Sequence, residues 1–465
     1  MIRVFSQYVS LKSFLLIAIE SFVIVMSLVL GARLRFWNDP GEFLLYAGSG
    51  SFLIQVATVL IVLEICCYYN DLYDLSIVRP RGEQFLCLTQ ALGAGCLLLG
   101  LLYYLIPGLL VGRGVLFIAL LLTTAVISTL RIGLDWVWQL TTREKVVLIL
   151  GDGEIAVTAA RELERRVDLN FRIAGFVASE RTQRSELLQH PILGDKTELR
   201  EITRDQRVSK IIVALDDLRG ALPIRDLVRL RVQGIEIEDA HSALAALTGR
   251  VWLRTVRPSW FVFSTGFHRS KTTLLLKRII DLAFGLLGFV LLSPVIILTA
   301  MAVRLDSKGP VLYRQTRVGL TGKVFNLVKF RSMQFNAECD KGAQWAQEGD
   351  PRITRVGRFI RKYRLDELPQ FFNVIRGEMS FVGPRPERPC FVEELREQIP
   401  YYDERHSVRP GITGWAQVEY GYGASVEDAF RKLEYDLFYL KHLSILFDIA
   451  IVFRTVRVVL FGFGR

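Results

Sequence analysis

The chain has 465 residues, of which 51% are hydrophobic and 23% charged, and its formal net charge is +11 at pH 7. The hydrophobic residues are concentrated in a few long blocks, so the composition indicates a membrane protein with a cationic cytoplasmic face and argues against a nucleic-acid-binding protein. The six cysteines form no C-x-x-C or Cys/His spacing, which argues against a disulfide framework and against a zinc site.

The N-terminal region contains four hydrophobic runs that are long enough to cross roughly 30 Å of hydrocarbon. They cover residues 13–31, 45–69, 85–106 and 114–138. We interpret the first as a retained helix and not as a signal peptide, because it has no small-residue cleavage site. The distribution of Lys and Arg between the connections favours a cytoplasmic position for both ends. Glu20 and Glu64 lie within spans, and we interpret them as polar contacts between helices rather than as parts of a transport path.

The next segment, residues 145–245, alternates short β-rich runs with amphipathic stretches. This alternation predicts a parallel sheet covered by helices. The sequence GDGEIA, with Gly151 and Gly153, lies where a Rossmann turn would receive a dinucleotide phosphate, and Glu180 follows at about the distance of a ribose-binding acid. Residues 140–270 contain no tyrosine, so a Tyr/Lys redox pair cannot exist there. We expect a structural or regulatory Rossmann-like module, with bound NAD or another nucleotide as the less favoured alternative.

A fifth hydrophobic block extends from Ile279 to Val303 and has Lys and Arg clusters on both sides. A helix that crossed the bilayer would leave one of these clusters on the outer face, against the positive-inside rule. Within the block, Pro294 removes one helix hydrogen bond and bends the helix, while the Ser293 hydroxyl can bond a freed backbone group. We expect a re-entrant helix over residues 274–305 that enters and leaves the same leaflet. A kinked spanning helix is the alternative.

The candidate chemistry lies in the stretch RITRVGRFIRKYRLDELP, which begins at Arg352. Its first arginines recur every three residues, which predicts a helix that lies flat on an anionic membrane surface. The row ends at two adjacent carboxylates, Asp366 and Glu367, which on a helix would project about 100° apart and could flank one bound group. Arginines that could grip phosphate bidentately lie at Arg364, Arg376, Arg385 and Arg388.

This constellation favours phosphoryl transfer. An ionised aspartate can attack phosphorus, and magnesium commonly binds one or two carboxylates together with phosphate oxygens. Positioning and electrostatic stabilisation then supply most of the catalysis. An ordinary solvated helix surface is the alternative, because adjacent Asp and Glu residues are common there.

Several motifs follow one another in order between residues 270 and 465. They include LLLKRIIDLAFGLLGFVLLSP, GPVLYRQTRVGLTGKVFNLVKFRSM, RKYRLDELPQFFNVIRGEMSFVGPRPERP and RPGITGWAQ. Together they resemble the bacterial sugar transferase family, the polyprenyl-phosphate sugar-1-phosphate transferases. The resemblance implies that Asp366 is the nucleophile and that Glu367 binds magnesium. It also implies a phospho-sugar aspartyl intermediate formed from a UDP-sugar with release of UMP, and transfer of the phospho-sugar to polyprenyl (undecaprenyl) phosphate.

The same resemblance implies six further residues at the substrate. Five are basic and match family positions that are expected to hold phosphates, and one is acidic: Lys329, Arg331, Arg364, Arg385, Arg409 and Asp436. An ordinary salt bridge is the alternative role for Asp436. We interpret the turn and aromatic residues of RPGITGWAQ as residues that set the fold.

We therefore expect a membrane protein of the α plus α/β class. Its parts are a four-helix transmembrane region, a Rossmann-like module, a linker and a monotopic, α-rich catalytic domain, over residues 1–141, 142–250, 251–270 and 271–465. The resemblance implies initiation of exopolysaccharide or O-antigen-type synthesis, as in members near exosortase-linked clusters. It also implies a multi-pass protein of the bacterial inner membrane, with a cytoplasmic catalytic domain and a possible homodimer. A non-catalytic nucleotide-sensing scaffold and a membrane-tethered nucleotide-sugar oxidoreductase are the alternatives.

Overall fold

The computed structural model divides the chain into two compact units, Met1–Ala243 and Leu244–Arg465. The residues that it describes are 2–4, 7–77, 79–141, 144–178, 190–215, 222–256, 258–264, 266–267, 270–334, 350–421, 423 and 425–461.

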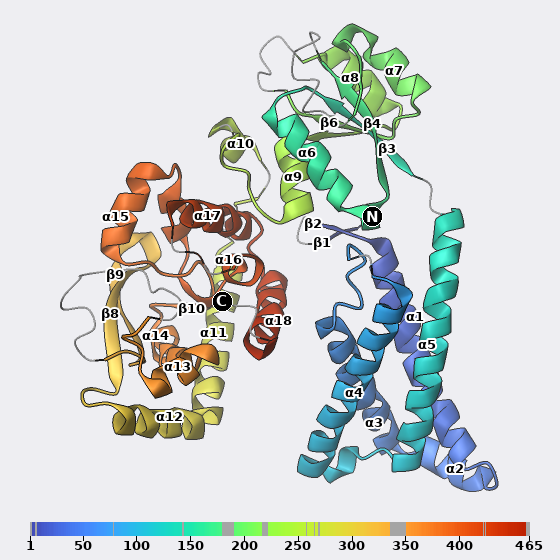
Figure 1. Cartoon of the computed structure of the whole chain (residues 1–465), viewed down its shortest axis with the longest axis vertical. Helices are drawn as coiled ribbons and strands as arrows, with labels where there is room; N and C mark the ends of the chain where they lie inside the picture. The colour runs from blue at the N-terminus through green and yellow to red at the C-terminus, as the bar shows by residue number, and fades with distance from the viewer. Residues whose placement is uncertain are drawn as a thin grey trace. The chain divides into compact units, whose positions relative to one another are not determined.

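Long hydrophobic helices form the N-terminal part of the first unit (Figure 1). They are α1 (Leu11–Arg35), α3 (Gly50–Tyr69), α4 (Arg81–Leu105) and α5 (Arg113–Thr141), with the short helices α2 (Pro40–Ala47) and η1 (Pro107–Leu109) between them. Among the residues that the structure describes, these four long helices are individually long and apolar enough to cross a membrane. One bent pair of helices in the second unit is long and apolar enough only when its two helices are taken together, and it could add a fifth span. The four predicted spans are thus confirmed as helices of membrane-spanning length.

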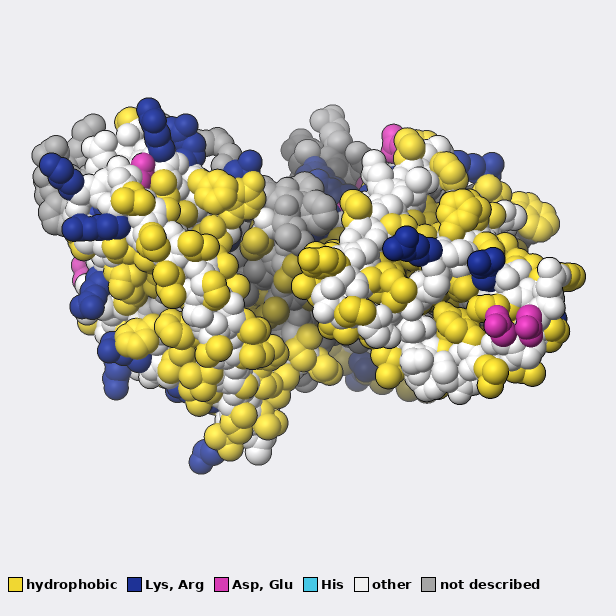
Figure 2. All heavy atoms as spheres, turned by 90° about the horizontal axis from the view of Figure 1, so that it is seen from below, with side chains coloured by type: hydrophobic (Ala, Val, Ile, Leu, Met, Phe, Trp, Pro, Cys, Tyr) yellow, Lys and Arg dark blue, Asp and Glu magenta, His cyan; other side chains and the backbone are white. Residues whose placement is uncertain are grey.

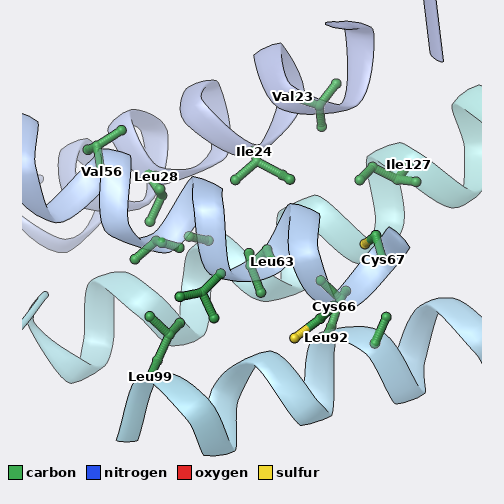
Figure 3. Close-up of a cluster of buried hydrophobic side chains, with 14 of the residues drawn as sticks. Val23, Ile24, Leu28, Val56, Leu63, Cys66, Cys67, Leu92, Leu99 and Ile127 are labelled. Carbon is green, nitrogen blue, oxygen red and sulfur yellow. The ribbon is translucent and has the colours of Figure 1, made fainter. Parts of the chain in front are cut away.

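The core of this helix bundle is made of branched aliphatic side chains (Figure 3). Ile24 and Leu28 of α1, Leu63 of α3, Leu99 of α4 and Ile127 of α5 are each no more than 1% exposed. Because the helices carry hydrophobic residues on their outer faces as well, the bundle is apolar all round, as expected of helices that contact lipid.

Two glutamates in the bundle bond to neighbouring segments. The Arg131 guanidinium of α5 donates to both carboxylate oxygens of Glu20 in α1, over 2.7 and 3.0 Å. Glu64 of α3 accepts hydrogen bonds from Ser21 at 2.7 Å and from Tyr73 at 2.6 Å. Polar groups inside a bundle need such partners, so the structure supports the interpretation of both glutamates as contacts between helices.

A five-stranded parallel sheet follows, with strand order β5-β4-β3-β6-β7. The strands are β3 (Lys145–Leu150), β4 (Phe171–Val177), β5 (Ile192–Gly194), β6 (Lys210–Val213) and β7 (Glu236–Asp239). The helices α6 (Glu154–Arg165), α7 (Leu199–Asp205), α8 (Ile224–Val232) and α9 (Ala240–Thr248) alternate with them. The parallel pairing confirms the predicted βαβ series. The strands are continuous apolar runs because a parallel sheet is buried on both faces.

Two details of this module bear on the sequence predictions. Gly151 lies at the β3–α6 turn with φ +127°, and a Cβ there would lie 2.2 Å from the Ala214 carbonyl oxygen, so the turn requires glycine. Glu180 lies outside the described residues. The sequence analysis missed an antiparallel hairpin of β1 (Ile2–Val4) and β2 (Gln7–Val9), because its strands have three residues each.

The second unit is rich in helices and contains two small sheets (Figure 1). In chain order its elements are α10 (Pro258–Phe263), α11 (Lys271–Leu291), α12 (Ser293–Asp306), β8 (Leu312–Val318), η5 (Leu320–Gly322), β9 (Val324–Phe330), α13 (Arg355–Lys362), η6 (Leu365–Glu367), α14 (Gln370–Arg376), β10 (Ser380–Val382), α15 (Pro389–Gln398), η7 (Tyr402–Ser407), β11 (Gly411–Thr413), α16 (Trp415–Glu419), α17 (Val426–Lys441) and α18 (Ile445–Phe461). Strands β8 and β9 pair antiparallel, and β10 pairs parallel with β11. Residues of the expected linker contact α17, where the Val251 N–H donates to the Glu434 carbonyl over 3.0 Å.

The fifth hydrophobic block forms the bent pair α11–α12, with an angle of 61° between its helices. The break is at the predicted position, and the Ser293 hydroxyl donates to the Val290 carbonyl over 2.7 Å. Pro294 lies in the first turn of α12, where its missing N–H leaves no hydrogen bond unmade. The bend is therefore present as expected, and the re-entrant path through one leaflet remains a prediction.

The two helices of this pair present a hydrophobic surface. Ile297, Leu298, Met301 and Leu305 of α12 are all more than half exposed. The body on the left of Figure 2 shows hydrophobic side chains gathered on one face with Lys and Arg side chains around them. Such a combination is typical of a surface that contacts anionic lipid.

Candidate active site

The two carboxylates lie on a tight turn between α13 and α14. Helix α13 starts after Thr354, whose hydroxyl accepts a hydrogen bond from the Gly357 N–H over 2.9 Å. Arg364 then adopts a left-handed conformation with φ +53°, which cannot continue a right-handed helix. The chain turns there into η6, which carries Asp366 and Glu367.

This arrangement differs from the helix that the arginine repeat predicts. Arg352 precedes α13 and pairs with Asp350, with 2.5 Å between Nη2 and Oδ2. On the 3₁₀ turn the two acidic side chains point about 120° apart rather than 100°. Asp366 is 8% exposed, so the ordinary solvated helix surface is excluded as its environment.

Glu367 is held by two arginines. Its Oε1 atom lies 2.8 Å from Arg385 Nη2 and 3.6 Å from Arg364 Nη1. Burial raises the pKa of Glu367, but Arg385 and Arg364 outweigh burial and hold the pKa below its ordinary value. Glu367 is therefore ionised at neutral pH.

Asp366 has a different environment on the same turn. Burial and the negative charge of Glu367 raise the pKa of Asp366 to about 6, although Lys329, Arg361 and Arg385 lower it. Burial and Arg317 lower the pKa of Lys329 to about 8, although Asp366 raises it. At neutral pH the site therefore holds two carboxylates and a protonated Lys329 among arginines.

Arg385 reaches Glu367 from a loop that follows β10. We name residues 383–387 the Arg385 loop. A Cβ on Gly383 would lie 2.4 Å from the Arg409 carbonyl oxygen, and one on Gly411 would lie 2.2 Å from the Gly383 nitrogen. The two segments approach so closely that only glycine fits at these positions, which explains the glycines of the GPRP and RPGITG motifs.

Three of the basic residues expected at the substrate lie near the dyad, and two bond elsewhere. Lys329, Arg364 and Arg385 interact electrostatically with Asp366 or Glu367. Arg331 is 4% exposed, and its guanidinium donates to the carbonyls of Ser307 and Lys308 after α12. Arg409 donates to the Gly377 carbonyl at the far end of α14. The contacts of Arg331 and Arg409 are those of residues that hold helix ends.

Other residues singled out in the sequence also have defined contacts. Asp436 of α17 is 1% exposed and accepts a hydrogen bond from Arg405 over 2.9 Å. Burial raises the pKa of Asp436 to about 6, although Arg405 lowers it. Arg376 stacks on Phe372 at 4.2 Å, and Arg388 lies 6.0 Å from the ring of Phe391. Trp415 is 1% exposed, as expected of a residue that sets the fold.

The sequence reasoning missed three arginines that surround the site, Arg317, Arg361 and Arg405. Arg317 donates to the Pro386 carbonyl over 2.9 Å, and Arg405 donates to the Arg385 carbonyl over 3.0 Å. Arg361 lowers the pKa of Asp366. Arg317 and Arg361 lie within the quoted family motifs, but arginines are frequent throughout this region, so spacing alone did not separate them from surface residues.

The donor set fits magnesium bound together with a substrate. No group of three His, Cys, Asp or Glu side chains that could hold a metal by itself occurs in the part of the chain that the structure describes. Glu367 is ionised at neutral pH and Asp366 lies next to it on the same turn, so this turn offers two carboxylates to one cation. Magnesium typically takes one or two carboxylates and completes its shell with water and substrate phosphates.

Two family models match the chain. The model described as bacterial sugar transferase matches residues 272–462, and the model described as CoA-binding domain matches residues 69–237. The first match contains the whole candidate site, and the second covers strands β3 to β6 of the Rossmann-like sheet and the first residues of β7.

Several curated proteins are similar to the chain. A UDP-N-acetylgalactosamine-undecaprenyl-phosphate N-acetylgalactosaminephosphotransferase of Aeromonas hydrophila is 42% identical over 270 residues, which are 58% of the chain and 62% of that relative. A UDP-glucose:undecaprenyl-phosphate glucose-1-phosphate transferase of Escherichia coli is 34% identical over 340 residues, 71% of the chain and 70% of the relative. An undecaprenyl-phosphate glucose phosphotransferase of Komagataeibacter xylinus is 34% identical over 67% of the chain and 58% of its own length.

Proposed function

The chain belongs to the bacterial sugar transferase family, and we propose that it is an undecaprenyl-phosphate sugar phosphotransferase that moves a sugar 1-phosphate from a UDP-sugar to undecaprenyl phosphate. The names of the relatives support this reaction class. The single observation that carries the proposal is the buried Asp366 beside an ionised Glu367, with Lys329 and Arg385 facing both.

The first step is an attack by Asp366 on the sugar-bearing phosphorus of the UDP-sugar. A new bond forms between a carboxylate oxygen and that phosphorus, while the bond from the phosphorus to the bridging oxygen breaks. UMP leaves with the electron pair, and a phospho-sugar aspartyl intermediate remains. With a pKa of about 6, Asp366 is mostly ionised at neutral pH and can act as the nucleophile.

The second step transfers the phospho-sugar to the lipid. An oxygen of undecaprenyl phosphate attacks the same phosphorus, the aspartyl–phosphorus bond breaks, and the Asp366 carboxylate is restored. Both steps move a phosphoryl group without an external oxidant, reductant or proton donor.

The surrounding cations neutralise the phosphate charge. Arg385 and Arg364 can turn from Glu367 toward the diphosphate, and the protonated Lys329 lies on the Asp366 side of the site. Glu367 would hold magnesium, which when bound neutralises charge on the diphosphate and stabilises the departing UMP.

The lipid acceptor requires the site to lie close to a membrane surface. We propose that α11 and α12 form a re-entrant hairpin in the cytoplasmic leaflet of the bacterial inner membrane. The exposed apolar residues of α12 and the 57% exposed Phe359 on α13 would contact lipid there. The catalytic unit would then face the cytoplasm, where UDP-sugars are available, and initiate exopolysaccharide or O-antigen-type synthesis.

The test is a single substitution. Asp366→Asn should abolish UMP release from UDP-glucose and UDP-N-acetylgalactosamine in membranes that contain undecaprenyl phosphate, because an amide cannot form the intermediate. Mass spectrometry of the lipid products would identify the sugar transferred. Near-normal turnover by this variant would contradict the proposal. Failure of the isolated module of residues 145–245 to bind NAD in a titration would exclude the oxidoreductase alternative.

A further inference from the structure

The backbone of the Arg385 loop is fixed by hydrogen bonds to other segments. Four consecutive carbonyl groups of this loop each accept a hydrogen bond from another segment. The donors to Pro384, Arg385, Pro386 and Glu387 are, in that order, the Gly411 N–H, Arg405 Nη2, Arg317 Nη1 and the Val318 N–H, over 2.9 to 3.0 Å. Two of the donors are therefore arginine side chains.

The side chain of Arg385 contrasts with this fixed backbone. It is 44% exposed and ends at Glu367, where the diphosphate is proposed to bind. Because the backbone is already ordered, binding of a phosphate by Arg385 orders only the side chain and costs less conformational entropy. The position of the loop therefore determines whether the Arg385 guanidinium lies within hydrogen-bonding distance of the phosphate.

Arg405 is built into the interior behind the loop. Its side chain is 7% exposed and lies 2.9 Å from Asp436, whose side chain is 2% exposed. It also donates to the Tyr402 hydroxyl over 2.6 Å. With its donors directed at the Arg385 carbonyl, Asp436 and Tyr402, Arg405 has the contacts of a residue that holds the loop and not those of a phosphate ligand.

We infer that Arg405, oriented by Asp436, is a positioning residue that holds the Arg385 loop so that Arg385 can bind the diphosphate of the UDP-sugar. This inference rests on the proposed function and deepens it. It assigns Asp436 an indirect role at the substrate, through Arg405 and the Arg385 carbonyl.

The helix that carries Asp436 supplies a matched control. Glu434 of α17 is also fully buried and pairs with Arg250 at 3.3 Å and Arg431 at 3.2 Å. Glu434 also accepts a hydrogen bond from the Leu253 N–H over 3.1 Å. These contacts of Glu434 are with segments other than the Arg385 loop. Asp436→Asn and Glu434→Gln therefore each remove one buried charge from the same helix, and only the first acts on Arg405.

The experiment is a double-mutant cycle in the full-length protein. The variants are Asp436→Asn, Arg385→Ala and their combination, with Glu434→Gln in both backgrounds. The readouts are kcat/KM for UMP release, with UDP-glucose and UDP-N-acetylgalactosamine as donors, and the Kd of UDP in the presence of magnesium. We expect Asp436→Asn to lower kcat/KM and to weaken UDP binding about tenfold or more when Arg385 is present, and less than about threefold when it is absent. Glu434→Gln should change either value less than about threefold in both backgrounds.

The possible outcomes separate this inference from the proposed function. Equal losses from Asp436→Asn in the two backgrounds, or an equal loss from Glu434→Gln, would overturn the positioning role while leaving the reaction intact. A wild-type protein that neither binds UDP nor releases UMP would overturn both.

A second variant covers the case in which Asp436→Asn does not fold. Arg405→Met combined with Asp436→Leu replaces the buried ion pair by apolar side chains of similar volume, an exchange that often preserves stability. We expect this variant to keep the melting temperature but to lose kcat/KM about tenfold or more, because the Arg385 carbonyl has lost its donor. Full activity of a folded Arg405→Met/Asp436→Leu protein would contradict the inference.

Discussion

At the scale of single residues, the surroundings of Asp366 and Glu367 give two adjacent carboxylates different properties. Glu367 is stabilised in its ionised form by Arg385 and Arg364, whereas burial and the charge of Glu367 disfavour the ionised form of Asp366. A carboxylate that is ionised but poorly stabilised is a better nucleophile than one that is neutralised by an ion pair. The opposite pKa shifts of the two carboxylates thus agree with a nucleophilic role for Asp366 and a metal-binding role for Glu367.

This difference predicts the pH dependence of the reaction. We expect kcat/KM for UMP release to be highest between about pH 7 and pH 8 and to fall about tenfold for each pH unit below about pH 6, because the protonated Asp366 cannot attack. Above about pH 8 the rate should fall again, because Lys329 loses its proton. Initial rates at low UDP-sugar concentration, measured over this range, provide the test. A profile without any decline near pH 6 would contradict the assignment of Asp366 as the nucleophile.

The same raised pKa predicts an effect on stability. The pKa of Asp366 in the folded chain, about 6, lies above its ordinary value of 3.8, so ionisation of Asp366 lowers the stability of the fold progressively between about pH 4 and pH 6, and the full loss is present above pH 6. We expect Asp366→Asn to raise the free energy of unfolding by up to about 3 kcal/mol at pH 8, and to raise the melting temperature accordingly. The gain should shrink as the pH falls toward 4, where wild-type Asp366 becomes protonated in both states.

Thermal melts of the two proteins in one detergent at pH 8 and pH 5 would check this. The inactive variant should be the more stable one at the higher pH. Equal melting temperatures at pH 8 would indicate that the carboxylate is not destabilised by its surroundings.

At the scale of elements, the bent pair α11–α12 connects the hydrophobic surface to the loop that carries Arg385. The polar groups of α11 face the protein, where Lys277 bonds to the Val382 carbonyl over 2.9 Å and pairs with Asp448 at 2.5 Å. Asp281 accepts hydrogen bonds from Ser380 and from the Phe381 N–H. Strand β10 is therefore fixed to the same helix whose outer face is apolar.

The re-entrant arrangement predicts that both ends of the pair lie on the same side of the membrane. In a variant without the native cysteines, Lys271→Cys before the bend and Lys308→Cys after it should both react with a membrane-impermeant thiol reagent from the cytoplasmic side. Labelling can be compared between intact cells and inverted membrane vesicles. Reaction of the Lys308→Cys protein from outside the cell alone would indicate a spanning helix instead.

At the scale of the whole molecule, the candidate site lies entirely within Leu244–Arg465. The first unit has its own contacts, including a buried group in which Lys210 donates to the Tyr8 hydroxyl over 2.5 Å and pairs with Glu238. Tyr8 belongs to the N-terminal hairpin, and Lys210 and Glu238 belong to the parallel sheet. The hairpin and the sheet are thus joined within one unit by a buried polar cluster.

This division predicts that catalysis does not require the first unit. We expect a chain that begins at Leu244 to keep UMP release within about tenfold of the full-length kcat/KM, because every residue assigned to the site is present. The comparison should use both proteins in the same detergent with undecaprenyl phosphate. Complete loss of activity in a folded fragment would show that the first unit contributes to the site.

Much of the fold follows from local pattern. The lengths of the hydrophobic runs predicted the four membrane helices, and the alternation of apolar strands with amphipathic helices predicted the parallel sheet. Pro294 marked the bend of the fifth block, because proline acts on its own turn. Local pattern placed the ends of the helices less accurately. The hydrophobicity pattern predicted a single run that starts at residue 45, whereas the structure has two helices there, α2 and α3.

The candidate site was predictable to the extent that it depends on adjacent residues. Asp366 and Glu367 are neighbours in the sequence, and the motifs around them identified the family. The roles of the arginines depend on contacts between distant segments. Arg331 and Arg409 hold helix ends, whereas Arg385 meets Glu367 across 18 positions of the chain.

By itself, the sequence therefore determined the membrane helices, the βαβ order, the position of the bend and the acidic pair, because each depends on residues that are close along the chain. Only the tertiary structure decided that Asp366 is buried, that Arg385 and not Arg331 meets the dyad, and that Arg405 and Asp436 lie behind the Arg385 loop. The physical reason is that burial and charge pairing arise where distant segments pack together, and an arginine looks the same in a sequence whatever carbonyl or carboxylate it meets.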